Sequence, residues 1–97
     1  MKKEDLIARL SQAGVTYSDR GKEIFAGWGP YSLHAIVSSA NECLISMGYS
    51  VWQGPEFCTS HSHSFEEAKA DLVRRLKRHY TSLWPQYEAD LLEWMRL

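Results

Sequence analysis

Residues 31–53 read YSLHAIVSSANECLISMGYSVWQ, and whether they form strands or a helix decides the fold class of this protein. Apolar residues alternate with polar or small ones over residues 31–38 and again over residues 43–51. Such alternation is typical of strands that place one face on a core. Residues 39–42, Ser-Ala-Asn-Glu, would then form the loop of a β-hairpin.

A helix is the alternative for the same stretch. Six apolar residues would share one helical face, and Gly48 would stand at the end of the helix. They are Leu33, Ile36, Val37, Ala40, Leu44 and Met47. We favour two strands, because serine and β-branched residues are frequent here and β-branched residues suit a pleated sheet.

The residues before this stretch predict a helix and a strand. Apolar side chains recur at helical spacing in residues 3–13, and Gly14 stands where a C-terminal cap is expected. Residues 19–22, Asp-Arg-Gly-Lys, indicate a turn. The apolar run over residues 24–28 is typical of a strand, and a Gly-Pro pair ends it.

The residues after this stretch predict a loop and two helices. Residues 54–64 open with Gly-Pro and indicate a loop. Ser64 and Glu67 form an S-x-x-E capping box, which marks the start of a helix over residues 65–83. Pro85 ends or kinks that helix and begins another. The first helix has one apolar stripe, made of Phe65, Ala68, Leu72, Val73, Leu76, Tyr80 and Leu83.

Together these elements predict an α+β fold in one domain, residues 1–97. It would contain an N-terminal helix, a small antiparallel three-stranded sheet and two C-terminal helices. A chain of 97 residues has the length of one domain and no room for a second core.

Composition and charge exclude several classes of function. The formal net charge of −1 gives no general attraction to nucleic acid or to anionic lipid. No apolar stretch approaches the roughly 20 residues of a transmembrane helix. Residues 1–6 are not a signal peptide, since they carry acids at once. Cys43 and Cys58 form no CxxC pair. We therefore expect no membrane contact and a location in the cytoplasm.

A basic cluster near the end of the predicted helix is the first candidate site. Arg74, Arg75, Lys77 and Arg78 lie away from the apolar stripe or at its edge, and no acid occurs between Asp71 and Glu88. One interpretation is a surface that binds phosphates or an acidic partner. The other is a solvated face, because acids at the start and bases at the end of a helix complement its dipole.

Aromatic residues near the C-terminus are the second candidate site. Trp84, Tyr87, Trp94 and Met95 crowd the last 14 residues. A helix of this composition either packs against the sheet or offers an apolar face to a partner. We select Trp84 and Trp94 as candidate partner-binding residues.

The segment from Cys58 to His63 contains one cysteine and two histidines within six residues. A thiolate and two imidazoles are zinc ligands, yet C-x-x-H-x-H matches no common structural zinc spacing. Cys58 with His61 or His63 is also a conceivable nucleophile and base, but no glycine-rich oxyanion turn accompanies them. We therefore expect no metal, no cofactor and no catalytic residue.

Residues 64–70, SFEEAKA, follow a strand-rich region that contains Trp28 and Tyr31. This pattern resembles small phage and prophage accessory proteins, in which a hairpin precedes a helix that opens with an EEAKA-like run. The resemblance implies a protein without catalysis that binds and modulates a host enzyme, as the inhibitors of RecBCD-type nucleases do. It assigns no functional residue.

The predicted order of helix, three strands and helix also looks like that of a double-stranded-RNA-binding domain. Ser64 and the pair Ala68-Lys69 match the start of the last helix in that family. The positions that clamp phosphates are occupied by Phe65, Glu66 and Glu67, and two acids there would repel an RNA backbone.

The sequence thus leads to one expected function and one alternative. We expect a non-enzymatic protein-interaction module, encoded by a phage, that inhibits or modulates a host nuclease or other DNA-processing enzyme in the host cytoplasm. Its contacts would be Arg74, Arg75, Lys77, Arg78, Trp84 and Trp94. The alternative is direct nucleic-acid binding through the basic helix over residues 65–83.

Overall fold

The stretch that decides the fold forms a β-hairpin. In the computed structural model, which describes residues 1–50, 54 and 56–79, β3 (Tyr31–Val37) and β4 (Cys43–Ser50) are antiparallel strands. Leu33 pairs with Met47 in their register. Every second residue of β3 is buried, as the alternating pattern predicted. The strand interpretation is confirmed, and the helical alternative is wrong.

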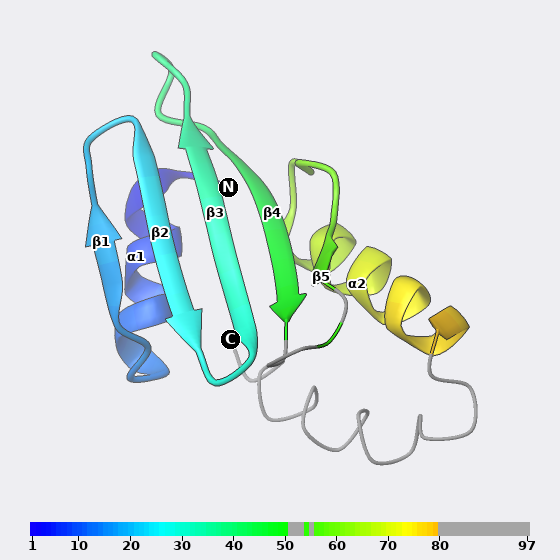
Figure 1. The fold of residues 1–97 in the computed structure, drawn as a ribbon. Helices are drawn as coiled ribbons and strands as arrows, with labels where there is room; N and C mark the ends of the chain where they lie inside the picture. Colours follow the sequence, from blue (N-terminus) through cyan, green and yellow to red (C-terminus); the bar gives the residue numbers. More distant parts are fainter. Residues whose placement is uncertain (51–53, 55, 80–97) are drawn as a thin grey trace.

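The hairpin forms the centre of a five-stranded antiparallel sheet (Figure 1). β1 (Tyr17–Asp19) and β2 (Glu23–Trp28) precede it, and β5 (Glu56–Cys58) follows it. The strands lie side by side in sequence order, so each pairs with its neighbour in the chain. The expected three-stranded sheet is therefore wrong, because β1 and β5 flank the three predicted strands.

One face of the sheet carries both described helices. α1 (Lys3–Gln12) and α2 (Phe65–His79) each contribute buried side chains to a single core with the inner face of the sheet. α1 contributes Leu6 and Leu10, and α2 contributes Phe65, Ala68, Leu72 and Leu76. Figure 1 shows α1 behind β1 and β2 and α2 beside β5.

The expected pair of C-terminal helices is also corrected. One helix, α2, follows the sheet in the part of the chain that the structure describes. The second, expected after Pro85, lies outside the described residues, as do the last four residues of the helix expected over 65–83. Neither described helix is long and apolar enough to span a membrane.

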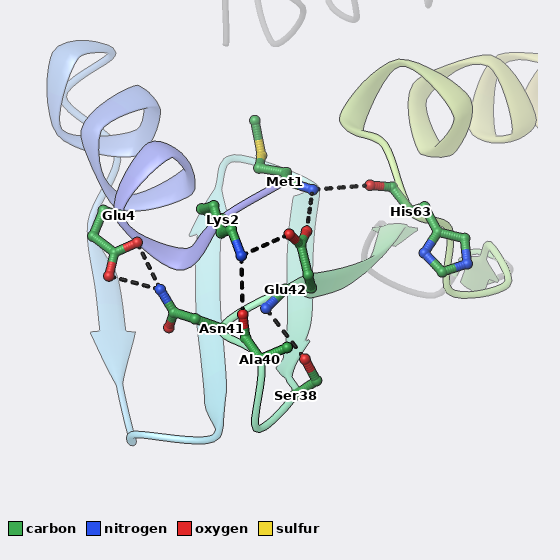
Figure 2. A network of polar contacts seen from close by, with 8 residues as sticks. All are labelled: Met1, Lys2, Glu4, Ser38, Ala40, Asn41, Glu42 and His63. Atoms are coloured by element: carbon green, nitrogen blue, oxygen red, sulfur yellow. Dashed lines mark hydrogen bonds and ion pairs between the residues drawn. The ribbon is translucent and has the colours of Figure 1, made fainter.

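The first residues of the chain attach α1 to the turn between β3 and β4 (Figure 2). The backbone N–H of Cys43 donates to the carbonyl of Met1 at 2.8 Å, and Lys2 and Glu42 form an isolated β-bridge. The Glu42 carboxylate accepts from the Met1 amine at 3.1 Å and pairs with the Lys2 ammonium at 2.9 Å. These contacts fix where α1 begins relative to the sheet.

Candidate functional site

The predicted cap fixes the start of α2. The hydroxyl oxygen of Ser64 accepts a hydrogen bond from the backbone N–H of Glu67 at 3.1 Å, which is the serine half of the capping box. Glu66 and Glu67 lie in the first turn, and Lys77, Arg78 and His79 lie in the last. This distribution of charge complements the helix dipole.

The buried stripe of α2 determines where its basic side chains point. Its buried residues recur at steps of three and four, which places them on one side of the helix. Because that side faces the core, the other sides face solvent. The four expected basic residues are all exposed there, namely Arg74, Arg75, Lys77 and Arg78.

Asp71 is the acidic partner of two of these bases. Its carboxylate lies 3.2 Å from the guanidinium of Arg74 and 3.3 Å from that of Arg75. Burial raises the pKa of the Asp71 carboxyl, but hydrogen bonds from Arg75 and Arg74 and their positive charges outweigh it and lower the pKa. Asp71 therefore stays charged, and it partly offsets the bases beside it.

Lys77 and Arg78 differ from this pair. Neither forms an ion pair with another residue in the described ranges 1–50, 54 and 56–79. Both are exposed in the last turn of α2. Two positive charges at this end of the helix are thus available to a partner.

Shallow depressions flank these side chains. One, of about 300 Å³, is lined by Asp71, Arg74, Arg75 and Arg78. A second depression, of about 400 Å³, lies between α2 and the segment that precedes it in the chain. Its lining consists of Ser60, Ser62, Glu67, Ala70, Asp71, Arg74 and Arg75. We call the surface formed by Arg74, Arg75, Lys77 and Arg78 the basic face of α2.

A third depression adds an aromatic side to the basic face. It has a volume of about 290 Å³ and is lined by Phe57, Arg75, Arg78 and His79. The rings of Phe57 and His79 lie 5.3 Å apart at a steep angle. Sequence reasoning missed Phe57, because residues 54–64 were assigned to a loop. The expected aromatic contacts, Trp84 and Trp94, lie outside the described residues.

The cysteine and histidines that lie within six residues of sequence make different contacts in the structure. Cys58 is exposed at the end of β5, opposite Gly48. The Nε2 atom of His61 lies 3.2 Å from Nδ1 of His34, a residue of β3. His63 accepts a hydrogen bond from the Met1 amine through its backbone carbonyl (Figure 2). Among the described residues, no three metal-ligating side chains gather around one point.

Comparison of the chain with protein-family models, with curated proteins and with solved structures gives no match.

Proposed function

We propose that this protein is a non-enzymatic interaction module that binds an acidic surface of a protein partner through the basic face of α2. The observation that supports this most is the imbalance of charge at the end of the helix. Asp71 faces Arg74 and Arg75, whereas Lys77 and Arg78 have no acidic partner in the part of the chain that the structure describes. An acidic partner would complete these pairs.

The neighbouring depressions favour a protein partner over nucleic acid. Asp71 lines both of the depressions that contain Arg74, and Glu67 lines the larger one. A phosphate backbone is negative along its whole length and would meet these carboxylates as well as the bases. A protein surface can place its acids opposite the bases and hydrogen-bond donors opposite Asp71 and Glu67. The net charge of −1 likewise gives no general attraction to nucleic acid.

The identity of the partner is part of the proposal. The resemblance to phage accessory proteins suggests a host nuclease or another DNA-processing enzyme in the cytoplasm. The partner that this proposal requires is an enzyme with acidic residues at the edge of its DNA-binding channel. The basic face would contact such an edge and obstruct access to the channel, so that inhibition would be steric and electrostatic.

Replacing Lys77 and Arg78 by glutamine tests this proposal. These two residues are chosen because the Asp71 ion pairs remain intact in the variant. The matched control replaces Arg20 and Lys22 by glutamine, which removes the same charge from the turn between β1 and β2. Each protein is immobilised and exposed to a bacterial lysate, and a retained protein is then purified and its affinity measured directly.

We expect the wild type and the control to bind the purified partner, and the Lys77/Arg78 variant to bind at least about tenfold more weakly. Equal affinity of all three proteins would refute the role of the basic face. A mobility-shift assay with duplex and single-stranded DNA at about 0.15 M salt addresses the alternative function. Tight DNA binding that the Lys77/Arg78 variant loses would replace our proposal with nucleic-acid binding.

A further inference from the structure

His34 lies on the face of the sheet opposite to α1 and α2. Its neighbours along β3, Leu33 and Ala35, are buried in the core, so His34 points the other way. The His34 ring stacks on the ring of Phe25, its cross-strand partner in β2, with centroids 4.7 Å apart and an angle of 16° between the planes. This stacking restricts how the imidazole can turn.

His61 reaches the same place from the segment between β5 and α2. Its Nε2 atom lies 3.2 Å from Nδ1 of His34, and the two rings are close to perpendicular. Residues on both sides of His61 are bonded to β4. The backbone N–H of Thr59 donates to the carbonyl of Met47, and the Met47 N–H donates to the hydroxyl of Thr59. Ser62 exchanges two backbone hydrogen bonds with Ile45. The segment therefore holds His61 beside His34.

A carboxylate lies on the other side of the His34 ring. Oxygen Oε1 of Glu23 lies 3.7 Å from Nε2 of His34. That nitrogen is buried and has no hydrogen-bond partner among the described residues. A carboxylate at this position favours the tautomer with the proton on Nε2, which leaves the lone pair on Nδ1, the atom that faces His61.

We propose that His34 and His61 form a two-imidazole site for a borderline transition-metal ion such as Zn²⁺, with Nδ1 of His34 and Nε2 of His61 as ligands. Zinc–nitrogen bonds of about 2.0–2.1 Å at tetrahedral angles place two ligand nitrogens roughly 3.3 Å apart. Here the two nitrogens form a hydrogen bond 3.2 Å long, which the ion would replace once the shared proton leaves it. The two nitrogens are thus already spaced as a bound ion requires.

Glu23 would act as a positioning residue in this site: its carboxylate, 3.7 Å from Nε2 of His34 and not hydrogen-bonded to it here, would move closer and accept the Nε2–H. Metal-bound histidines commonly donate their second ring N–H to a carboxylate, which fixes the ring and makes the ligand nitrogen more basic. Water molecules complete the coordination, because no third ligand joins the two histidines within the described ranges. Such a site exchanges its metal readily.

Bound metal would link β3 to the segment that leads into α2. His61 precedes the Ser64 cap by three residues, so the ion would fix the start of that helix to the sheet. The site is independent of the basic face, since none of its three residues belongs to α2. Its failure would leave the proposed function untouched.

Titration of the protein with ZnCl₂, followed by calorimetry, tests the site. The test variants are His34→Gln and His61→Gln, and the matched control is His63→Gln, two residues from His61 in the same segment. We expect the wild type and the control to bind one zinc ion with the same affinity. Each test variant should bind at least about tenfold more weakly. Circular dichroism shows whether each variant retains its fold.

Nuclear magnetic resonance of the imidazole nitrogens gives a second measurement on the wild-type protein. Zinc should shift Nδ1 of His34 and Nε2 of His61 and leave the nitrogens of His63 unchanged. In Glu23→Gln, the tautomer of His34 with the proton on Nδ1 should gain population, and zinc affinity should fall. The proposal is overturned if zinc does not bind, if the variants lacking His34 or His61 bind it as well as the wild type, or if other nitrogens shift instead.

Discussion

At the scale of single residues, Gly48 is the position in β4 where a side chain has no room. A Cβ atom there would lie 2.5 Å from the hydroxyl oxygen of Ser32 and 3.3 Å from the carbonyl oxygen of Phe57. The first obstacle is the end of a side chain that can rotate, and the second is backbone. Glycine thus allows β5 to pair closely with the central hairpin.

Replacing Gly48 by alanine should lower the free energy of unfolding by about 1–3 kcal/mol, because the added methyl group forces its neighbours to move. Denaturation by urea measures the change. In the double variant with Ser32→Ala, the nearest obstacle to the new methyl group is gone, so part of the lost stability should return. The effects of substitutions at residues in contact are not additive. An alanine variant as stable as the wild type would show that β5 adjusts without strain.

Asn41 combines a left-handed backbone with a specific contact. Its φ is 64°, and its side-chain amide donates to both carboxylate oxygens of Glu4 at 2.7 Å (Figure 2). Asparagine tolerates this conformation better than most residues other than glycine.

Asn41→Ala should therefore destabilise the protein more than Asn41→Gly, by roughly 1 kcal/mol, because alanine loses the Glu4 contact and also strains the backbone. Asn41→Gly loses only the Glu4 contact, because glycine adopts this backbone conformation without strain. Thermal denaturation of both variants measures the order. The reverse order would mean that backbone conformation matters little at this turn.

Glu42 makes stability depend on pH. Hydrogen bonds from Lys2 and from the Met1 amine hold the pKa of the Glu42 carboxyl below its ordinary value of 4.5. The folded state therefore favours the ionised form, so this contribution is present above about pH 4.5 and is lost as the pH falls through the folded-state pKa.

Glu42→Gln should accordingly be less stable than the wild type at neutral pH, and the difference should shrink below pH 4.5. Chemical denaturation at pH 7 and at a series of lower values measures this. Because the carboxylate is exposed, high salt should reduce the difference as well. A difference that grows in acid would contradict the assigned direction of the shift.

At the scale of elements, α2 is the part that local sequence rules describe best. The sequence predicted the capping serine and the segregated charges, and both are present. Four residues of the predicted stripe are buried and Val73 is partly buried, while Tyr80 and Leu83 lie outside the described residues. β1 and β5 were not predicted, for a physical reason. Each has three residues, too few for alternation to show, and each is held by hydrogen bonds to a longer neighbour.

Ser64→Ala tests the cap. It removes the oxygen that accepts the Glu67 N–H and should lower the free energy of unfolding by about 1 kcal/mol. Ser64→Asp keeps an acceptor at this position and should retain most of the stability of the wild type. Urea denaturation compares the two variants. If alanine and aspartate are equally stable, packing of Phe65 and not the cap determines where α2 begins.

At the scale of the whole molecule, both described helices share one core with the sheet. Leu72 of α2 and Leu10 of α1 are fully buried in the same cluster as Ile45 of β4. Elements that bury their apolar faces against one another are expected to unfold together.

Leu72→Ala should lower stability by about 2–5 kcal/mol through the cavity that it creates. Because the core is shared, the helical signal in circular dichroism and the amide resonances of β3 and β4 should still report one common urea midpoint, shifted from that of the wild type. Separate midpoints for the two probes would show that α2 unfolds independently.

The sequence by itself determined the elements whose signal lies within a few neighbouring residues. Periodicity, caps and turn residues predicted α1, β2, the β3–β4 hairpin and α2. These signals depend on residues only a few positions apart in the sequence. The exposure of Arg74, Arg75, Lys77 and Arg78 followed in the same way. What these residues bind remains our proposal.

Only the tertiary structure decided the contacts between distant residues. It extended the sheet from three strands to five, placed Phe57 beside the basic face, and brought His34 of β3 to His61, 27 positions later in the chain. Short edge strands and side-chain pairs of this kind depend on neighbours that the fold supplies. The local residues alone contribute too little free energy to determine these strands and side-chain pairs, so their sequence gives too weak a pattern for prediction.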